Sequence, residues 1–265
     1  MLNLLFIGDI VGEPGRRAVI DLLPSLKEQY ELDFVVANAE NAAAGRGLTP
    51  KLAQVLLNAG AHVLTMGDHV WDQPDLAPWL SPDCHVLRPL NYPEGTPGVG
   101  SIVVDTPKGK VAVMQLQGRT FIQPPLENPF LMGLAEAERL RDEGVKVIFV
   151  DFHAETTSEK IAMGYHLAGH VSGVVGTHTH VQTADECIRE GGTAFLTDVG
   201  MCGPSDSVLG RDKAQVIKRF CTSMPTKFPV AGGPVLLCGV VIQIDETTGQ
   251  AVSIQRIQLP TGQAQ

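Results

Sequence analysis

The chain has 265 residues, of which 44% are hydrophobic and 18% are charged, so it can bury a sizeable core and is not a disordered segment. Its formal net charge of -9 argues against a general nucleic-acid coat or an anionic membrane as partner, because phosphate binding usually rests on clustered Lys and Arg. We expect a single α/β domain over residues 1–265 and no stable nucleic-acid complex.

Targeting and cysteine patterns point to an intracellular protein. The apolar stretch from Met1 to Asp9 lacks a basic leader and a small-residue cleavage site, so we interpret it as a core strand rather than a signal peptide. No apolar run reaches the roughly 18 residues that a membrane helix needs. The five cysteines are odd in number and show no C-x-x-C spacing, which favours neither a disulfide framework nor a zinc ribbon. We therefore expect a cytoplasmic protein.

Strand-like and helix-like patterns alternate along the first part of the chain. An apolar run predicts a buried strand over 2–8, and helical spacing of apolar residues predicts a helix over 15–30. A strand at 33–37 and another at 62–66 flank a helix over 51–59, for which Thr49 supplies an N-cap and Pro50 the first helical position. This order predicts parallel strands joined by right-handed crossovers.

The remaining patterns predict both parallel and antiparallel pairing. Strands at 102–105 and 111–117 flank a Pro-Lys-Gly turn, as in a hairpin, and a second hairpin pairs 235–245 with 251–258. The other predicted elements are helices at 129–143, 158–168 and 214–222, and strands at 145–151, 171–176 and 193–198. The chain is thus expected to form a mixed sheet system flanked by helices.

Polar groups follow several predicted strands at the point where each apolar run ends. In open α/β sheets such strand ends converge at one edge, where loops from several strands can share a site. Carboxylate, amide and imidazole donors gathered in this way could enclose more than one cation, which predicts a two-metal hydrolase. The groups are Gly8-Asp9, Glu40-Asn41, Gly67-Asp68-His69, His153 and Thr177-His178-Thr179-His180.

Each group alone also has an ordinary structural interpretation. Asp9 could cap the following helix, and Glu40 with Asn41 could form a simple acidic loop. His69 alone could be a histidine with satisfied hydrogen bonds. His178 and His180 would point the same way on an extended backbone, and so could reach one metal ion or two adjacent ones. Taken together, the five groups favour metal binding.

These motifs, in this order, resemble those of the calcineurin-like metallophosphoesterases. More narrowly they resemble the bacterial YmdB-like branch, whose members act as phosphodiesterases on 2',3'-cyclic nucleotides and related compounds. The resemblance covers nearly the whole chain. It rests on Gly8-Asp9-Ile10-Val11-Gly12, Asn38-Ala39-Glu40-Asn41, Gly67-Asp68-His69-Val70-Trp71-Asp72, Phe152-His153-Ala154-Glu155 and Gly176-Thr177-His178-Thr179-His180-Val181.

The resemblance implies a fold, a ligand set and a mechanism. The fold would be a four-layer αββα sandwich with mixed parallel and antiparallel sheets. The cofactor would be two metal ions, with iron expected and manganese or zinc as alternatives. His69 would be the catalytic proton donor to the leaving oxygen. Among the ligands, Asp9, Asn41 and His180 would hold one ion, Asp68, His153 and His178 the other, and Glu40 would bridge the two.

The expected chemistry accounts for these residue types. A phosphodiester repels hydroxide, and two cations about 3.5 to 4 Å apart would neutralise charge and hold a bridging hydroxide as nucleophile. Mixed oxygen and nitrogen donors suit iron, manganese or zinc better than calcium. The cations would also disfavour the protonated form of His69, so a carboxylate partner is needed. Asp72 could be that partner, or it could cap a helix.

One position departs from the family pattern, which normally carries asparagine where this chain has Asp68. The added negative charge leads us to the hypothesis that Asp68 binds its metal more tightly and makes it a weaker Lewis acid. Two other functions stay open: another metal-dependent hydrolase, or a regulatory protein with a mainly structural metal site. A small phosphodiester or nucleotide is the expected substrate, and a homo-oligomer would be usual for such a chain.

Overall fold

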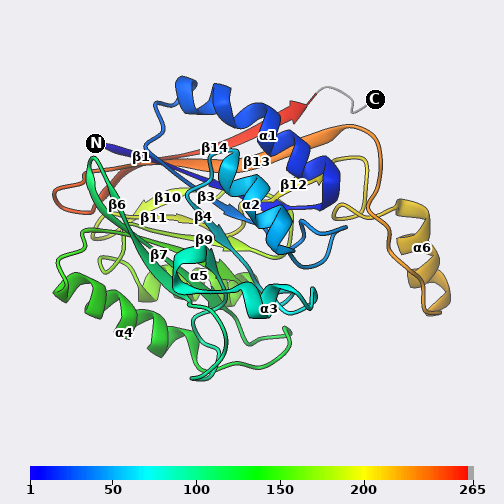
Figure 1. The fold of residues 1–265 in the computed structure, drawn as a ribbon, viewed down its shortest axis with the longest axis horizontal. Helices are drawn as coiled ribbons and strands as arrows, with labels where there is room; N and C mark the ends of the chain where they lie inside the picture. Colours follow the sequence, from blue (N-terminus) through cyan, green and yellow to red (C-terminus); the bar gives the residue numbers. More distant parts are fainter. Residues whose placement is uncertain (262–265) are drawn as a thin grey trace.

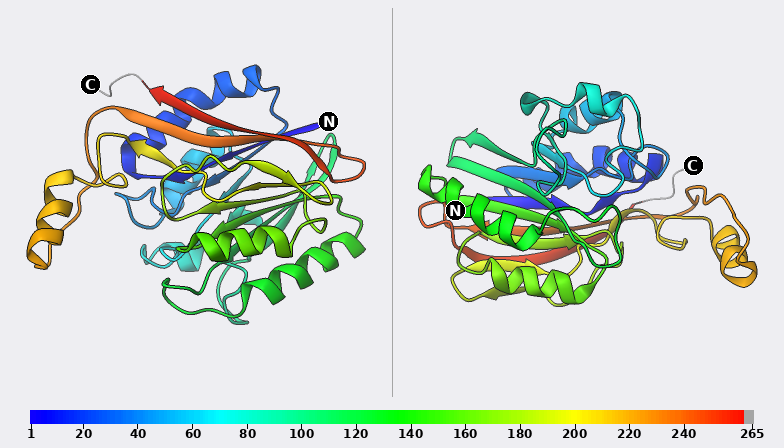
Figure 2. Two further views of the ribbon diagram at one scale, coloured as in Figure 1. Left: turned by 180° about the vertical axis from the view of Figure 1, so that it is seen from behind. Right: turned by 90° about the horizontal axis from the view of Figure 1, so that it is seen from below.

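The computed structural model describes residues 1–261 of the chain. Two β-sheets pack face to face, with helices on the outer face of each (Figure 1). Helices α1 (Gly12–Gln29) and α2 (Pro50–Asn58) contact the first sheet, whereas α4 (Pro129–Asp142) and α5 (Thr157–His166) contact the second. The views in Figure 2 show the same layers from behind and from below. The expected four-layer αββα sandwich is confirmed.

The first sheet combines a parallel half with an antiparallel half. Strand β1 pairs in parallel with β3, which continues in parallel to β4 and β5, and on its other edge β1 pairs antiparallel with β13. Within residues 1–261 the strands run in the order β2-β12-β13-β1-β3-β4-β5, and β14 also pairs with β13. Their bounds are β1 (Leu2–Ile7), β2 (Asp9–Ile10), β3 (Phe34–Asn38), β4 (Val63–Thr65), β5 (Val86–Leu87), β12 (Met201–Pro204), β13 (Val235–Ile244) and β14 (Ala251–Thr261).

The second sheet has a parallel centre and antiparallel edges. Strands β7, β8, β9 and β11 run in parallel, and β6 and β10 close the two sides. Both predicted hairpins, β6 with β7 and β13 with β14, are present. The bounds in this sheet are β6 (Ser101–Thr106), β7 (Gly109–Gln117), β8 (Val147–His153), β9 (Gly173–Thr177), β10 (Cys187–Arg189) and β11 (Thr193–Leu196).

Three apolar layers hold the four structural layers together. Leu5 and Ile7 of β1 belong to the layer beneath α1 and α2, whereas Phe6 belongs to the layer between the sheets. There its ring lies 5.2 Å from that of Phe149 on β8. A third apolar layer separates the second sheet from α4 and α5. Strands buried on both faces need apolar residues at successive positions, which explains the unbroken apolar run at the start of the sequence.

The structure corrects several predicted boundaries. Helix α1 begins at Gly12 rather than at residue 15, and β8 runs to His153, so that this histidine ends the strand instead of following it. The side chain of Thr49 caps α2 as expected, accepting from the amide of Leu52 at 3.3 Å. The short elements β2, β5, β10, β12, α3 (Leu76–Trp79) and the 3-10 turn at Pro82–Cys84 were not predicted, because two to four residues carry too little periodicity.

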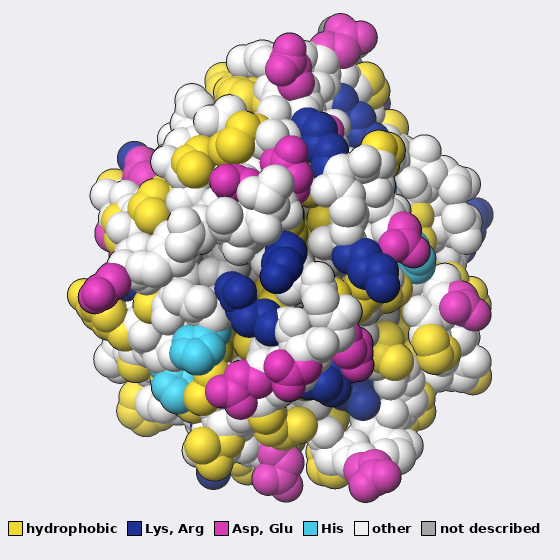
Figure 3. Space-filling view, turned by 90° about the vertical axis from the view of Figure 1, so that its left-hand side faces the viewer, with side chains coloured by type: hydrophobic (Ala, Val, Ile, Leu, Met, Phe, Trp, Pro, Cys, Tyr) yellow, Lys and Arg dark blue, Asp and Glu magenta, His cyan; other side chains and the backbone are white. Residues whose placement is uncertain are grey.

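On the face drawn in Figure 3, basic side chains lie near the middle and acidic ones lie around and between them, so this face presents charges of both signs. Along residues 1–261, no helix combines the length and the apolar character that crossing a bilayer would require. Helix α6 (Lys213–Thr222) stands away from the two sheets in each view of Figures 1 and 2.

A buried ion pair fixes the loop that follows β9. Lys160 of α5 and Asp198, just beyond β11, are each 1% exposed, and Nζ lies 2.7 Å from Oδ2. Lys160 also donates to Thr179 Oγ1 at 2.9 Å, and that hydroxyl in turn donates to Asp198 at 2.5 Å. Because Thr179 lies between His178 and His180, this network holds the backbone that carries both imidazoles.

Replacing Lys160 with methionine should therefore destabilise the protein. The change leaves the Asp198 carboxylate buried without its cation, which costs on the order of 3–5 kcal/mol. Urea unfolding of the two proteins measures the difference. Lys213→Met is the matched control, because its pair with Asp206 is exposed and is worth about 1 kcal/mol or less. Equal losses in the two variants would contradict a stabilising role for the buried pair.

Candidate metal centre

The seven predicted ligands lie at the carboxyl ends of strands from both sheets. Asp9 follows β1 closely, as the first residue of β2, and the pair Glu40 and Asn41 follows β3. The second sheet supplies the histidines, with His153 at the last position of β8. The complete set is Asp9, Glu40, Asn41 and Asp68 from segments that follow first-sheet strands, and His153, His178 and His180 from second-sheet strands or the loops that follow them. The two sheets thus meet at one site.

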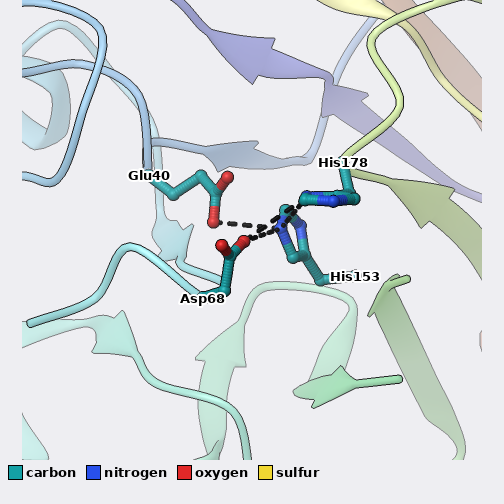
Figure 4. Close-up of side chains that lie close together, drawn as sticks. All are labelled: Glu40, Asp68, His153 and His178. Carbon is teal, nitrogen blue, oxygen red and sulfur yellow. Dashed lines mark hydrogen bonds and ion pairs between the residues drawn. The ribbon is translucent and has the colours of Figure 1, made fainter. Parts of the chain in front are cut away.

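Four of these side chains form a tight group (Figure 4). Glu40, Asp68, His153 and His178 each offer one ligand atom, and these four atoms lie within 4.8 Å of one another. His153 Nε2 is at the centre, 3.1 Å from Glu40 Oε2 and 3.0 Å from Asp68 Oδ1. His178 Nδ1 lies 3.0 Å from the same nitrogen. The group contains all the residues expected around one of the two ions.

The other three predicted ligands lie beside this group. His180 Nε2 is 3.6 Å from Asp9 Oδ1 and 3.4 Å from Asn41 Nδ2. Asn41 also donates through Nδ2 to Glu40 Oε1 at 3.0 Å, which joins the two parts of the cluster. In this orientation the amide nitrogen of Asn41 faces His180. To act as a metal ligand, the side-chain amide would have to rotate by about 180° so that its oxygen faces the site.

The partner of His153 Nδ1 fixes the ring so that Nε2 faces the carboxylates of the cluster. Thr177 Oγ1 donates to Asp151 Oδ1 at 2.7 Å, so towards His153 Nδ1, 2.8 Å away, the hydroxyl can only accept. Nδ1 therefore carries a hydrogen, and in the neutral ring the lone pair is on Nε2. Burial opposes protonation of this ring, but Glu40 and Asp68 outweigh it and raise the pKa of His153. A position that attracts a proton so strongly also attracts a metal cation.

The carboxylates show the same demand for positive charge. Burial acts to raise the pKa of Asp68, yet hydrogen bonds with His153 and His178 hold it below its usual range. The pKa of Glu40 is also lowered, because His153 offsets the effect of burial. Asp9 differs: its complete burial raises the pKa, with His180 opposing. Within residues 1–261, Asp9 Oδ1 and Glu40 Oε2 are buried and accept no hydrogen bond.

These observations fit a metal centre. Buried polar atoms are usually hydrogen-bonded, so the two unpartnered oxygens need another positive partner. Glu40 Oε2 does lie 3.1 Å from His153 Nε2, but without hydrogen-bond geometry. The backbone at Gly67 lies close against the cluster. A Cβ at this position would lie 2.2 Å from both Glu40 Oε2 and His153 Cδ2, so only glycine fits there. The donors present, oxygen and imidazole nitrogen, suit transition-metal cations.

The loop after β9 differs from the extended backbone considered in the sequence. His178 has φ 91° and His180 has φ 64°, so both adopt left-handed conformations that are unusual outside glycine. Strand β9 ends at Thr177, and the chain turns at the next residues instead of continuing as an extended strand. Both imidazoles still reach the cluster, but from a turn rather than from alternate positions of a strand. Such strained positions persist where the surroundings fix them, as Lys160 and Asp198 do here.

His69 lies at the rim of the cluster beside Asp72, which the sequence offered either as its carboxylate partner or as a helix cap. Its Nδ1 is 3.0 Å from Asp72 Oδ2 and 3.6 Å from Asp68 Oδ2. Asp72 is held in turn by Arg46, whose Nε donates to it at 2.5 Å. The structure therefore brings Asp72 to His69. This arrangement orients the imidazole ring and gives its Nδ1 an acceptor.

Several residues that support the ligands had no predicted role. Asp151, completely buried, accepts from Asn38 at 3.0 Å and from Thr65 at 2.5 Å, as well as from Thr177. Burial raises the pKa of Asp151 to about 7, with His153 and the hydrogen bonds from Thr65 and Thr177 opposing. Glu155 Oε2 lies 3.0 Å from His178 Nε2. Asp151 and Glu155 are both two positions from His153; Glu155 also belongs to the motif Phe152-His153-Ala154-Glu155, whereas Asp151 had no other sequence signal.

Comparisons with known proteins agree with this geometry. The family profile described as YmdB-like protein matches residues 5–257. The chain is 50% identical over 259 residues to the 2',3'-cyclic-nucleotide 2'-phosphodiesterase of Bacillus subtilis, covering 97% of this chain and 96% of that protein. It is also similar to a novel phosphatase of Mycoplasma pneumoniae of known structure, with a TM-score of 0.91, 36% identity, and coverage of 99% and 95%.

More distant structures share the fold alone. The 5'-nucleotidase precursor of Thermus thermophilus superposes with a TM-score of 0.59 at 14% identity, and this chain covers 54% of its length. The same arrangement of two sheets and outer helices thus recurs with little sequence in common. With the profile matching almost the whole chain and a relative at 50% identity, the chain belongs to the YmdB-like protein family.

Proposed function

We propose that the protein is a metal-dependent phosphodiesterase that hydrolyses small phosphodiesters such as 2',3'-cyclic nucleotides. The observation that carries the proposal is the group of four ligand atoms from Glu40, Asp68, His153 and His178, all within 4.8 Å of one another. The activity named for the B. subtilis relative, at 50% identity, supports the choice of substrate class. The chain would be a phosphoric diester hydrolase.

The seven predicted ligands would form two sets around a shared carboxylate. Asp9, Asn41 and His180 would hold one cation, Asp68, His153 and His178 would hold the other, and Glu40 would serve both. Iron is the proposed metal, with manganese or zinc as alternatives. When bound, such a pair would neutralise the charge of the phosphodiester and lower the pKa of a shared water, so that a hydroxide equivalent is available at neutral pH.

The protein's own residues would do the rest of the chemistry. As water attacks phosphorus, a new P–O bond forms and the bond to the leaving ester oxygen breaks, so that oxygen needs a proton. His69 lines the cavity beside the ligands and would donate the proton from Nε2, while Asp72 holds Nδ1 at 3.0 Å. The supporting bonds from Thr177 and Lys160 keep the imidazole ligands oriented without further rearrangement.

A substrate panel tests the class of reaction. Bis-p-nitrophenyl phosphate, p-nitrophenyl phosphate, 2',3'-cyclic AMP and a peptide amide are compared with and without chelator, and elemental analysis identifies the bound metal. We expect turnover of the diesters, lost on chelation and restored by iron or manganese. Faster turnover of the monoester or the amide would favour another metal-dependent hydrolase. No turnover at all, with metal retained, would favour a regulatory protein with a structural metal.

His69→Ala tests the proton donor. We expect kcat for 2',3'-cyclic AMP to fall on the order of 10²- to 10⁴-fold with metal content unchanged, because only the transfer of the proton is lost. A substrate with a good leaving group, bis-p-nitrophenyl phosphate, should be affected less. His170→Ala, outside the cluster, is the control. Full activity of His69→Ala on the cyclic nucleotide would remove the assignment.

Asp68→Asn tests the effect of the extra carboxylate. Removing one negative charge near the metal should weaken metal retention and raise turnover per bound metal, since the ion becomes a stronger Lewis acid. Metal content after dialysis and kcat at saturating metal are the two measurements. If both match the unchanged protein, the carboxylate has no special influence on the ion.

A further inference from the structure

A cavity of about 460 Å³ opens directly onto the metal cluster. On one side its walls are ligand residues, among them Glu40, Asn41 and His180. On the other side the segment between β12 and β13, which includes α6, provides an apolar wall. The residues of this wall, here called the α6 wall, are Val208, Leu209, Val216, Phe220 and Phe228, together with Arg211 and Arg219. The volume is in the range of small-molecule sites.

The α6 wall is anchored to the ligand loops. His180 Nδ1 lies 3.2 Å from the carbonyl oxygen of Leu209, so the wall begins within hydrogen-bond reach of a predicted ligand. Arg211 donates to the carbonyl oxygen of Phe228 at 3.1 Å and also to that of Gly45, on the loop that follows Glu40 and Asn41. These bonds fix the position of the wall relative to the cluster, although α6 stands away from the sheets (Figure 2).

The two aromatic rings of the wall are open to solvent. Phe220 is 81% exposed and Phe228 is 40% exposed, whereas Phe6, Phe34 and Phe149 of the core are fully buried. Solvent-exposed apolar side chains beside a polar site are typical of a surface that binds an apolar group. Each guanidinium donates within the wall, Arg211 as above and Arg219 to the carbonyl oxygen of Ser223 at 2.6 Å. The wall thus offers mainly flat apolar contact, with two guanidinium groups beside it.

We propose that the α6 wall receives the nucleobase of the substrate, with Phe220 and Phe228 as the residues that determine specificity. The inference rests on the proposed function, because a phosphodiester at the cluster would direct its ribose and base into this cavity. Aromatic contact binds a base through its flat face and does not depend on the pattern of donors and acceptors. Purine nucleotides, with the larger face, are therefore preferred over pyrimidine nucleotides.

The test compares a nucleotide with a substrate that lacks the base. The measured quantity is the ratio of kcat/KM for 2',3'-cyclic AMP to kcat/KM for the 2',3'-cyclic phosphate of methyl riboside. In Phe220→Ala the ratio should fall about tenfold, through KM for the nucleotide, since stacking on one aromatic ring is worth about that factor. Ile217→Ala is the matched control, since Ile217 is 57% exposed on the same helix and does not line the cavity.

A binding measurement separates this inference from the proposed function. Calorimetry of the holoenzyme with adenosine, which has no phosphate, should give binding that weakens about tenfold in Phe220→Ala, and ribose should give none. An unchanged ratio and unchanged adenosine binding in Phe220→Ala would overturn the inference. If the protein hydrolyses neither ester but binds adenosine through Phe220, the proposed function fails and the base site stands.

Discussion

The structure depends on one electrostatic constraint, the concentration of carboxylates and imidazoles in a cluster whose central members are buried. Glu40 is 1% exposed, and two of its neighbours in the cluster, Asp9 and His153, are fully buried. Charges removed from water are costly unless an opposite charge lies close by, and the attraction of a cation is strongest where the dielectric constant is low. Burial therefore both creates the need for bound cations and makes their binding strong. A cation is a partner that could satisfy all four converging ligand atoms at once.

Most of the surrounding fold holds the side chains of this cluster in place. No single sheet supplies the cluster, so the apolar layer between the sheets must hold β1, β3 and β4 in register with β8 and β9. Bonds to the ligands then fix their orientation: Thr177 and Asp151 set the ring of His153, and Lys160 with Asp198 holds the turn that carries His178 and His180. Left-handed backbone at both histidines accompanies the convergence of two predicted ligands from one short loop.

Much of this organisation could be predicted from the sequence. The long strands and helices have enough periodicity to be recognised, and the polar groups at their ends predict the candidate site at one edge of the sheets. The two hairpins and the capping role of Thr49 were also correct. What could not be predicted depends on contacts between distant segments. The two-residue pairing of β2 with β12 and the buried pair of Lys160 with Asp198 leave no local pattern, and the turn at His178 and His180 violates the extended geometry that their spacing suggested.

The segment between β12 and β13 differs from the rest of the site in how it is attached. Every predicted ligand lies at or near the end of a core strand, where a change of backbone would disturb a sheet. The α6 wall, in contrast, is joined to the ligand loops through a few bonds, such as that from His180 to the carbonyl oxygen of Leu209. Its length and side chains can diverge without altering the metal cluster. Related proteins could thus keep the same hydrolytic centre and differ in substrate range through variation in the segment between β12 and β13.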